Sequence, residues 1–298
     1  GVSPTDIIAN GGLFGDVIFF AVSGFCLVNV KDNFPKWYLK RILRIFPTVI
    51  VISAVFCISG LFKLNPESGI LGELFRMFIY PTSYHFIASI ILLYIPYYFV
   101  MKIDKLRNNI PVVAAAVALV WLVIYALFYD KSYYHIDTVR EPMIRFLFFF
   151  SMLMGAYFRN NKDKFINRKS VVSWILLPVL FVVYFISKLF FSKSDLLLDF
   201  QILNQIILFA LLFVTFRCFA SIDGILEKLP APIKKVLNFI SGITLEIYLV
   251  QIPLIQVLNI FPFPFNWIFI TSVIVLLAFV LNKISGLIQK GINKICKI

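Results

Sequence analysis

The stretch GGLFGDVIFFAVSGFCLVNVKDNFPKWYLKRILRIFP, residues 11–47, decides the fold class. It runs from an apolar segment through a short polar loop into a second apolar segment. Three cations, Lys40, Arg41 and Arg44, stand where the second segment begins, and Pro47 follows one turn later. Two apolar runs of this kind, separated by a basic loop, are typical of consecutive helices that cross a bilayer.

The composition of the whole chain extends this prediction. Of the 298 residues, 61% are hydrophobic and only 14% are charged, and the mean hydropathy is +0.93. Such a composition excludes an ordinary soluble domain and predicts a polytopic membrane protein. No hydrophilic stretch is long enough to fold separately, so we expect residues 1–298 to form a single integral-membrane domain.

Apolar runs of about 18 residues or more are long enough to cross a bilayer as helices. Only helices satisfy each backbone N–H within its own segment. We therefore predict an all-α transmembrane bundle with nine spans, which cover about residues 13–30, 45–62, 83–101, 110–129, 142–158, 171–191, 199–219, 236–258 and 265–282.

The cations alternate between the loops of this topology. Of the 28 lysines and arginines, 21 fall on one side, together with the C-terminus. The positive-inside rule places that side in the cytoplasm. The net charge of +13 therefore indicates topology signals and not a nucleic-acid partner. Nine spans that begin outside the cytoplasm also predict one more helix before Gly1, which would make ten.

The cysteines and histidines predict neither a disulfide framework nor a metal site. The four cysteines lack paired spacing and lie in or beside apolar segments, and the two histidines are far apart. A structural zinc site needs a cluster of such ligands.

Arg41 and Arg44 are three residues apart, so both guanidinium groups project from one face of a helix. Their planar forks suit phosphate oxygens better than lysine does. The pair therefore predicts either a docking point for a phosphate-bearing molecule or a membrane-boundary anchor.

Ionisable groups inside membrane segments are candidate functional residues by default. Asp16 lies near the outer end of the first span, where it can also reach interfacial water. Glu246 lies mid-span among several amides and hydroxyls. It is predicted to act either as a proton carrier or as a buried partner of an arginine. His85 begins the third span, where it could act as a general base or as an interfacial anchor.

Two further polar groups have alternative interpretations. Gln201, Asn204 and Gln205 are expected to link neighbouring helices. The predicted outer loop around His135 also contains Tyr133 and Tyr134. Their rings suit either stacking on sugars or an aromatic belt at the membrane interface.

With these residues in view, the chain resembles the membrane-bound acyltransferase 3 family, which includes bacterial O-acetyltransferases of surface polysaccharides. Local patterns carry a resemblance that extends over nearly the whole chain. The first is G-x-x-x-FF-x-x-SGF, at Gly15, Phe19, Phe20, Ser23, Gly24 and Phe25. The second is R-x-x-R-I-x-P, at Arg41, Arg44, Ile45 and Pro47. The third is the late S-x-x-x-IYL helix, at Ser241 or Thr244, then Ile247, Tyr248, Leu249 and Gln251. The segment YHFIASIILLYIP resembles a fourth pattern of the family, Trp-Phe-(x)n-Tyr-x-x-Pro, with His85 and Phe86 where an aromatic pair is usual.

The resemblance implies ten spans and an acetyl group taken from acetyl-CoA, whose phosphates Arg41 and Arg44 would bind on the cytoplasmic side. The acceptor would be a hydroxyl of a cell-envelope glycan at the outer face of a bacterial plasma membrane. No metal is implied.

This chain also departs from the family pattern. An Arg and a catalytic His belong to the family's first helix, which this sequence does not contain. Gln251 stands where the late helix usually has His, and Asp16 is one position earlier than the family's acidic residue. Glu246 and His85 are therefore the candidates for a catalytic base.

Two other functions fit the same pattern. One is a non-enzymatic transporter or flippase of a lipid-linked or anionic solute, which intramembrane Glu246 and its neighbouring amides would serve equally well. The other is a degenerate acyltransferase that acts as a scaffold, consistent with the missing histidine.

Overall fold

The structure is a computed structural model that describes residues 12–61, 69–76, 84–138, 142–193, 195–258 and 260–296. Helices make up 83% of it, and these residues contain no strand, which confirms the all-α prediction. Six of the described helices are long and apolar enough to cross a membrane, and a bent helix pair makes a possible seventh span.

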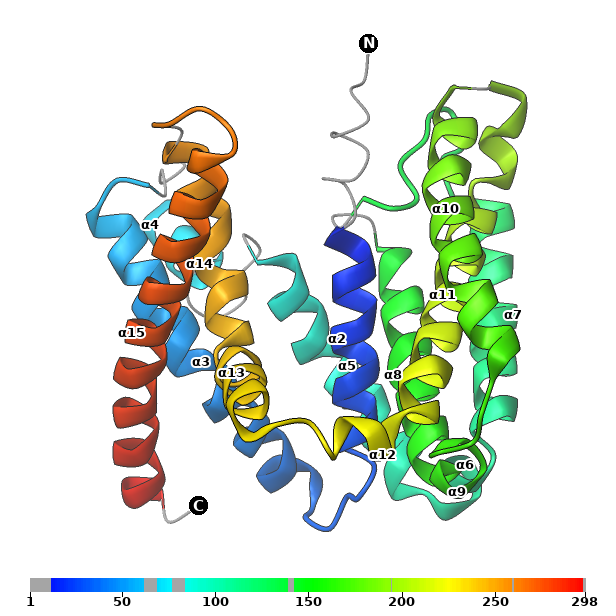
Figure 1. The fold of residues 1–298 in the computed structure, drawn as a ribbon, viewed down its shortest axis with the longest axis horizontal. Helices are drawn as coiled ribbons and strands as arrows, with labels where there is room; N and C mark the ends of the chain where they lie inside the picture. The colour runs from blue at the N-terminus through cyan, green and yellow to red at the C-terminus, as the bar shows by residue number, and fades with distance from the viewer. Residues whose placement is uncertain are drawn as a thin grey trace. The chain divides into compact units, whose positions relative to one another are not determined.

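The chain divides into two compact units (Figure 1). Unit 1 comprises residues 1–31 and 89–228, and unit 2 comprises residues 32–88 and 229–298. Unit 1 holds α2 (Gly12–Cys26), α6 (Asp104–Asn108), α7 (Ile110–Phe128), α8 (Ile144–Asn160), α9 (Lys162–Phe165), α10 (Val171–Lys193), the 3-10 helix η3 (Asp195–Phe200), α11 (Ile202–Ser221) and α12 (Asp223–Leu226). Unit 2 holds α3 (Phe34–Ile58), α4 (Gly69–Leu74), α13 (Ala231–Gly242), α14 (Thr244–Val257) and α15 (Phe265–Cys296). Helix α5 (His85–Lys102) begins in unit 2 and continues in unit 1.

Each of the nine predicted spans overlaps a helix of the described residues, although not always a helix long enough to cross a membrane alone. Helices α2 and α8 have 15 and 17 residues. The predicted span 236–258 is instead two helices, α13 and α14, which meet at Ile243 with a bend of 63°. Each half is apolar, so hydropathy alone does not reveal this break.

Helix α3 begins 11 residues before the predicted apolar span, because a local cap starts it. The side chain of Asn33 accepts a hydrogen bond from the backbone N–H of Lys36 at 3.4 Å, and Pro35 occupies the first turn, where its missing N–H costs nothing. The 25 residues of α3 rise about 37 Å, against about 30 Å of hydrocarbon. Counted back from Ile58, the hydrocarbon segment begins about two residues before Arg41.

The core of unit 1 forms where α2 lies against α8. Gly24 and Gly155 are the contact points, because a Cβ on Gly24 would collide with the carbonyl oxygen of Met152, and one on Gly155 with that of Ala21. Small residues allow such backbone-to-backbone approach between membrane helices. A second apolar cluster joins α7, α8 and α11 around Trp121, Tyr125, Ile136, Met143, Phe150 and Ile202.

Candidate functional site

The three cations at the start of α3 have different surroundings. The Lys40 ammonium forms an ion pair with Asp32 at 2.8 Å. The Arg41 guanidinium lies over the ring of Trp37, 5.1 Å from its centroid, and Trp37 itself is buried. Arg44, one turn further on, is exposed. The indole therefore holds one guanidinium in place while the next projects from the helix.

The loop before α3 is electrostatically matched to these cations. The hydrogen bond from Lys40 lowers the pKa of Asp32, and the nearby charges of Lys36 and Arg41 lower it further. Because Lys40 is engaged by this carboxylate, Arg41 and Arg44 are the groups in this segment best suited to an anionic ligand.

Glu246 lies at the break between α13 and α14, in the first turn of α14. Its residue is only 5% exposed. The side-chain amide of Asn282, on α15, donates to Glu246 Oε1 at 3.1 Å and to the carbonyl oxygen of Gly242 at 3.3 Å. A carboxylate is favourable near the unpaired N–H groups at the start of a helix. The mid-span position expected for Glu246 is thus the beginning of a half-helix.

His85 begins α5 between two residues that bind α14. The Tyr84 hydroxyl donates to the carbonyl oxygen of Leu249 at 3.2 Å, and the backbone N–H of Phe86 donates to the Tyr248 hydroxyl at 3.4 Å. The Phe86 and Tyr248 rings are 5.3 Å apart between centroids. Tyr248 of the late motif therefore fixes the segment that carries His85.

Gln251 lines a mainly apolar pocket of about 650 Å³ between α13, α14 and α15. Asn266, at the start of α15, lines the same pocket, and its side-chain oxygen accepts hydrogen bonds from the N–H groups of Ile260 and Phe261. The position at which the resemblance leads us to expect a histidine therefore faces a cavity.

The motif on α2 packs unit 1 together. Gly24 contacts α8, and its carbonyl oxygen accepts a hydrogen bond from the Tyr97 hydroxyl at 2.6 Å. Phe25 lies beneath the Arg159 guanidinium, 5.1 Å from it, and Phe20 stacks on Phe148 at 4.3 Å. Ser23 is half-buried on the same helix. This pattern explains the motif as a helix-packing device.

A buried ion pair in unit 1 escaped the sequence reasoning. Lys188 Nζ lies 2.7 Å from Asp137 Oδ2, and the two side chains are 10% and 17% exposed. The ammonium also lies 5.0 Å from the ring centroid of Tyr184, whose hydroxyl interacts electrostatically with Asp16 and Asp137. The sequence did contain a signal for this pair, because Lys188 lies within an apolar run. An ionisable residue inside a membrane segment is a candidate functional residue, as for Glu246.

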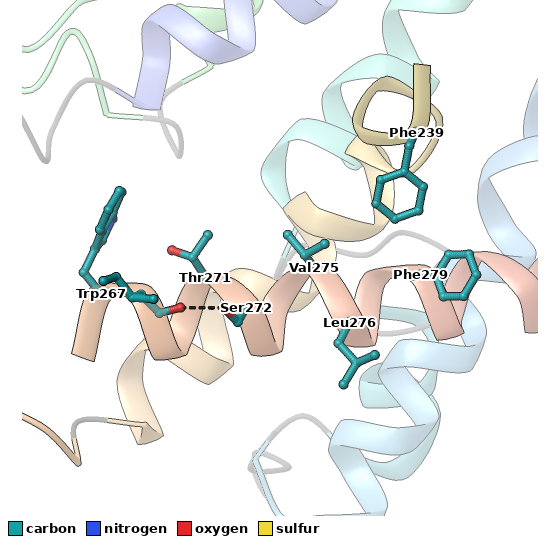
Figure 2. Close-up of a pocket in the computed structure, with 8 residues that line it drawn as sticks. Phe239, Trp267, Thr271, Ser272, Val275, Leu276 and Phe279 are labelled. Carbon is teal, nitrogen blue, oxygen red and sulfur yellow. Dashed lines mark hydrogen bonds between the residues drawn. The ribbon is translucent and has the colours of Figure 1, made fainter. Parts of the chain in front are cut away.

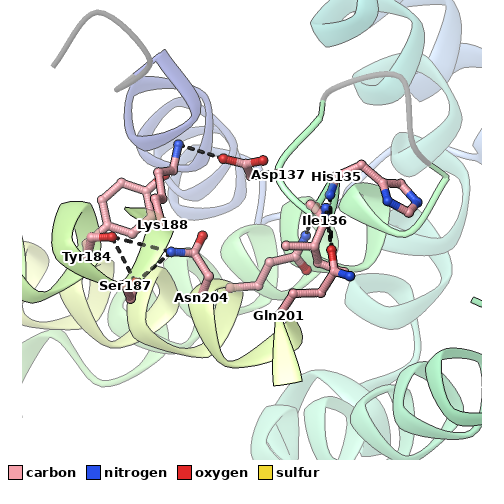
Figure 3. Close-up of polar contacts among 9 residues, drawn as sticks. His135, Ile136, Asp137, Tyr184, Ser187, Lys188, Gln201 and Asn204 are labelled. Atoms are coloured by element: carbon pink, nitrogen blue, oxygen red, sulfur yellow. Dashed lines mark hydrogen bonds and ion pairs between the residues drawn. The ribbon is translucent and has the colours of Figure 1, made fainter. Parts of the chain in front are cut away.

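Side-chain amides at the start of α11 hold the loop that carries Asp137 (Figure 3). Gln201 Oε1 accepts hydrogen bonds from the N–H groups of His135 and Ile136 at 3.1 and 3.0 Å. Gln205 donates to the carbonyl oxygen of Ile136. Asn204 instead donates to Ser187 Oγ at 2.7 Å and links α11 to α10. The prediction of interhelical links thus holds for Asn204, whereas both glutamines bind a loop.

Two tyrosines of this loop stack on the ring of His135. The His135 ring lies 4.1 Å from that of Tyr133 and 4.7 Å from that of Tyr129, close to parallel with both. Tyr133 is 56% exposed. Burial raises the pKa of Tyr134, and the carboxylate of Asp137 raises it further, so this phenol keeps its proton at neutral pH.

The comparison with protein families decides the affiliation. The family model described as "Acyltransferase domain" matches residues 3–283, nearly the whole chain. The chain belongs to the acyltransferase 3 family. No curated protein and no solved structure matches it.

For this acyltransferase 3 chain, the structure divides the candidate site residues between the two units. Unit 2 holds Arg41, Arg44, His85, Glu246, Tyr248 and Gln251. Unit 1 holds Asp16, Ser23, Gly24 and Phe25. Among the described residues, no group of three or more His, Cys, Asp or Glu could hold a metal ion.

Proposed function

We propose that this chain is an O-acyltransferase that takes an acetyl group from cytoplasmic acetyl-CoA. The acceptor we propose is a hydroxyl group of a cell-envelope glycan on the opposite side of a bacterial plasma membrane. Membership of the acyltransferase family supports the reaction class, and several helices apolar enough to cross a membrane support the location.

The observation that carries the donor assignment is the arginine pair at the start of α3. Trp37 holds the Arg41 guanidinium at 5.1 Å, and Arg44 is exposed one turn on. Coenzyme A carries several phosphates, and two guanidinium forks close to the membrane boundary suit them better than lysines would. The excess of lysine and arginine in the loops on this side supports a cytoplasmic position for this end of α3 by the positive-inside rule, and acyl-CoA is found in the cytoplasm.

The transfer needs a base that removes the proton from an attacking hydroxyl. The nucleophile, which is either the acceptor hydroxyl or a side chain that carries the acyl group to it, attacks the thioester carbonyl carbon, and the thiolate of coenzyme A leaves as the C–S bond breaks. Glu246 and His85 are the candidates in unit 2. Glu246 is held by Asn282, and His85 is positioned by its neighbours Tyr84 and Phe86.

The test is transfer of label from acetyl-CoA in membrane vesicles that contain the full chain. We expect Arg41→Ala and Arg44→Ala each to weaken donor binding tenfold or more, because a charge-assisted contact is worth about 1.5–3 kcal/mol. Lysine at either position should recover only part of this loss. Arg168→Ala, which removes another exposed arginine from a basic loop, is the matched control. Full activity of both alanine variants would exclude the donor site.

The base is tested separately through kcat. Replacing the true base, by Glu246→Gln or His85→Ala, should lower kcat while the affinity for coenzyme A stays unchanged. If neither variant lowers kcat at normal expression, the base lies elsewhere in the chain.

The break between α13 and α14 favours one competing function. Transporters place half-helix ends and buried charges at their substrate sites, and Glu246 occupies such a half-helix start. Counterflow of a lipid-linked or anionic solute without any acyl-CoA requirement would support a transporter and contradict the acyltransferase. Dependence of a neighbouring glycan enzyme on a chain without transfer activity would instead indicate a scaffold.

A further inference from the structure

An apolar groove runs along one side of α15. Phe239 of α13 forms one wall, and α15 supplies the rest, from Trp267 to Phe279 (Figure 2). Its volume is about 530 Å³, within the usual range of ligand pockets, about 300–1,000 Å³. The other lining residues are Ile268, Thr271, Ser272, Val275 and Leu276. We call this feature the α15 groove.

The few polar groups in the α15 groove contribute little polarity. The Ser272 hydroxyl donates to the carbonyl oxygen of Ile268 at 2.8 Å, so its donor is satisfied within its own helix. Thr271 adds one hydroxyl and one methyl group. The groove therefore suits a hydrocarbon chain and not a sugar or a nucleotide.

A cation stands at one end of the groove. The Lys283 ammonium lies over the ring of Phe279, 5.3 Å from its centroid. Phe279 in turn contacts Phe239 across the groove, with ring centroids 5.7 Å apart. An exposed ammonium group therefore adjoins the Phe279 end, and Trp267 stands at the other.

The groove is long enough for most of an acyl chain. Twelve positions separate Trp267 from Phe279, which is about 18 Å along the helix, somewhat more than half of a hydrocarbon core about 30 Å thick. Lys283 is about 27 Å along α15 from Phe265, close to the edge of a hydrocarbon core about 30 Å thick, from which a lysine side chain can extend to the phosphates.

We propose that the α15 groove binds one acyl chain of an anionic glycerophospholipid from the surrounding membrane, with the lipid phosphate at Lys283. Charge complementarity selects this occupant, because the groove lining and α13 contain no acidic residue and the adjoining group is a cation. The α13 lysines Lys234 and Lys235 add positive charge to the same unit. This site is separate from the proposed donor site at Arg41 and Arg44.

Native mass spectrometry of the purified full chain tests the site, with phosphatidylglycerol and phosphatidylcholine of identical acyl chains as the probes. We expect the chain to retain phosphatidylglycerol in preference to phosphatidylcholine. Lys283→Gln should weaken phosphatidylglycerol binding roughly tenfold, as expected for one charge-assisted contact. Lys290→Gln, which removes another exposed lysine two turns further along α15, should change it little. Equal retention of both lipids by the unaltered chain, or equal losses in the two variants, would overturn the proposal.

Filling the groove tests the acyl chain. Thr271→Trp should reduce the binding of both lipids, whereas Leu277→Trp, on α15 but outside the groove lining, should not. Unchanged binding by Thr271→Trp would refute the groove as the seat of the chain. If this variant does not fold, quenching of native Trp267 by brominated phosphatidylglycerol replaces it, with Trp267→Phe as the background. No quenching, or a lipid-free dimer that covers the groove, would also refute the proposal.

Discussion

The amide of Asn282 on α15 and the carboxylate of Glu246 on α14 are joined by a hydrogen bond of 3.1 Å. The same amide reaches the last residue of α13, through the Gly242 carbonyl oxygen. One side chain of the long helix α15 therefore connects the two helices on either side of the break. This contact satisfies a buried carboxylate and a helix-end carbonyl that would otherwise lack partners at membrane depth.

Removing the Asn282 amide should destabilise unit 2. We expect Asn282→Leu to lower the free energy of unfolding by about 1–3 kcal/mol, because a buried hydrogen-bond acceptor loses its donor. Thermal unfolding in detergent measures the effect. Asn160→Leu, which removes an exposed amide bonded to the Arg107 carbonyl oxygen, should cost less. Equal costs would contradict a special role for the contact with Glu246.

Adding a single methyl group at the contact between α2 and α8 should destabilise the fold. We expect Gly24→Ala and Gly155→Ala each to cost about 1–3 kcal/mol or more, since a Cβ meets backbone that cannot turn away. Gly15→Ala, on the same helix with nothing within 4 Å of its Cβ position, should be neutral or slightly stabilising. Yield of folded protein and its melting temperature distinguish these outcomes. Tolerance of alanine at both contact glycines would show that the helices do not approach this closely.

The ion pair between Lys188 and Asp137 should be costly to break from one side. Lys188→Met leaves a nearly buried carboxylate without its cation, which typically costs about 3–5 kcal/mol. Adding Asp137→Asn should recover part of that loss, and Lys193→Met, at the exposed end of α10, should cost little. A double-mutant cycle on unfolding temperatures measures the coupling. Additive losses would mean that the two charges do not interact.

The ion pair between Lys40 and Asp32 predicts a pH dependence. The hydrogen bond from Lys40 lowers the pKa of Asp32, so the folded chain binds this proton less readily than the unfolded chain. The stabilisation is present above the unfolded pKa, near 3.9, and is lost as the pH falls through the lower folded pKa. Carbon-13 NMR titration should show a higher pKa in Lys40→Gln and a smaller rise in Lys36→Gln. An unchanged titration in Lys40→Gln would exclude the pair in solution.

The helices are predictable from the sequence because long apolar segments in a membrane must satisfy their own backbone hydrogen bonds. Sequence reasoning placed helix in all nine ranges, and the family affiliation followed from short motifs on α2, α3 and α14. The break at Ile243 was not predicted, since an apolar composition does not specify whether the helix axis continues straight or bends. The partnership of Lys188 with Asp137 was missed as well, because 51 positions separate the two residues and only the fold brings them together. The roles of Arg41, Arg44, Glu246 and His85 remain predictions.

The glycine contact between α2 and α8 has a mechanical consequence. Side chains between two helices act as a layer that permits small sliding, and at Gly24 and Gly155 backbone touches backbone without such a layer. These two contacts therefore oppose sliding of α2 along α8. At Ile243, by contrast, the chain turns through 63° beside Gly242, whose Cβ position is surrounded by open space. A change in this bend therefore requires the Asn282 amide to release Gly242 or Glu246.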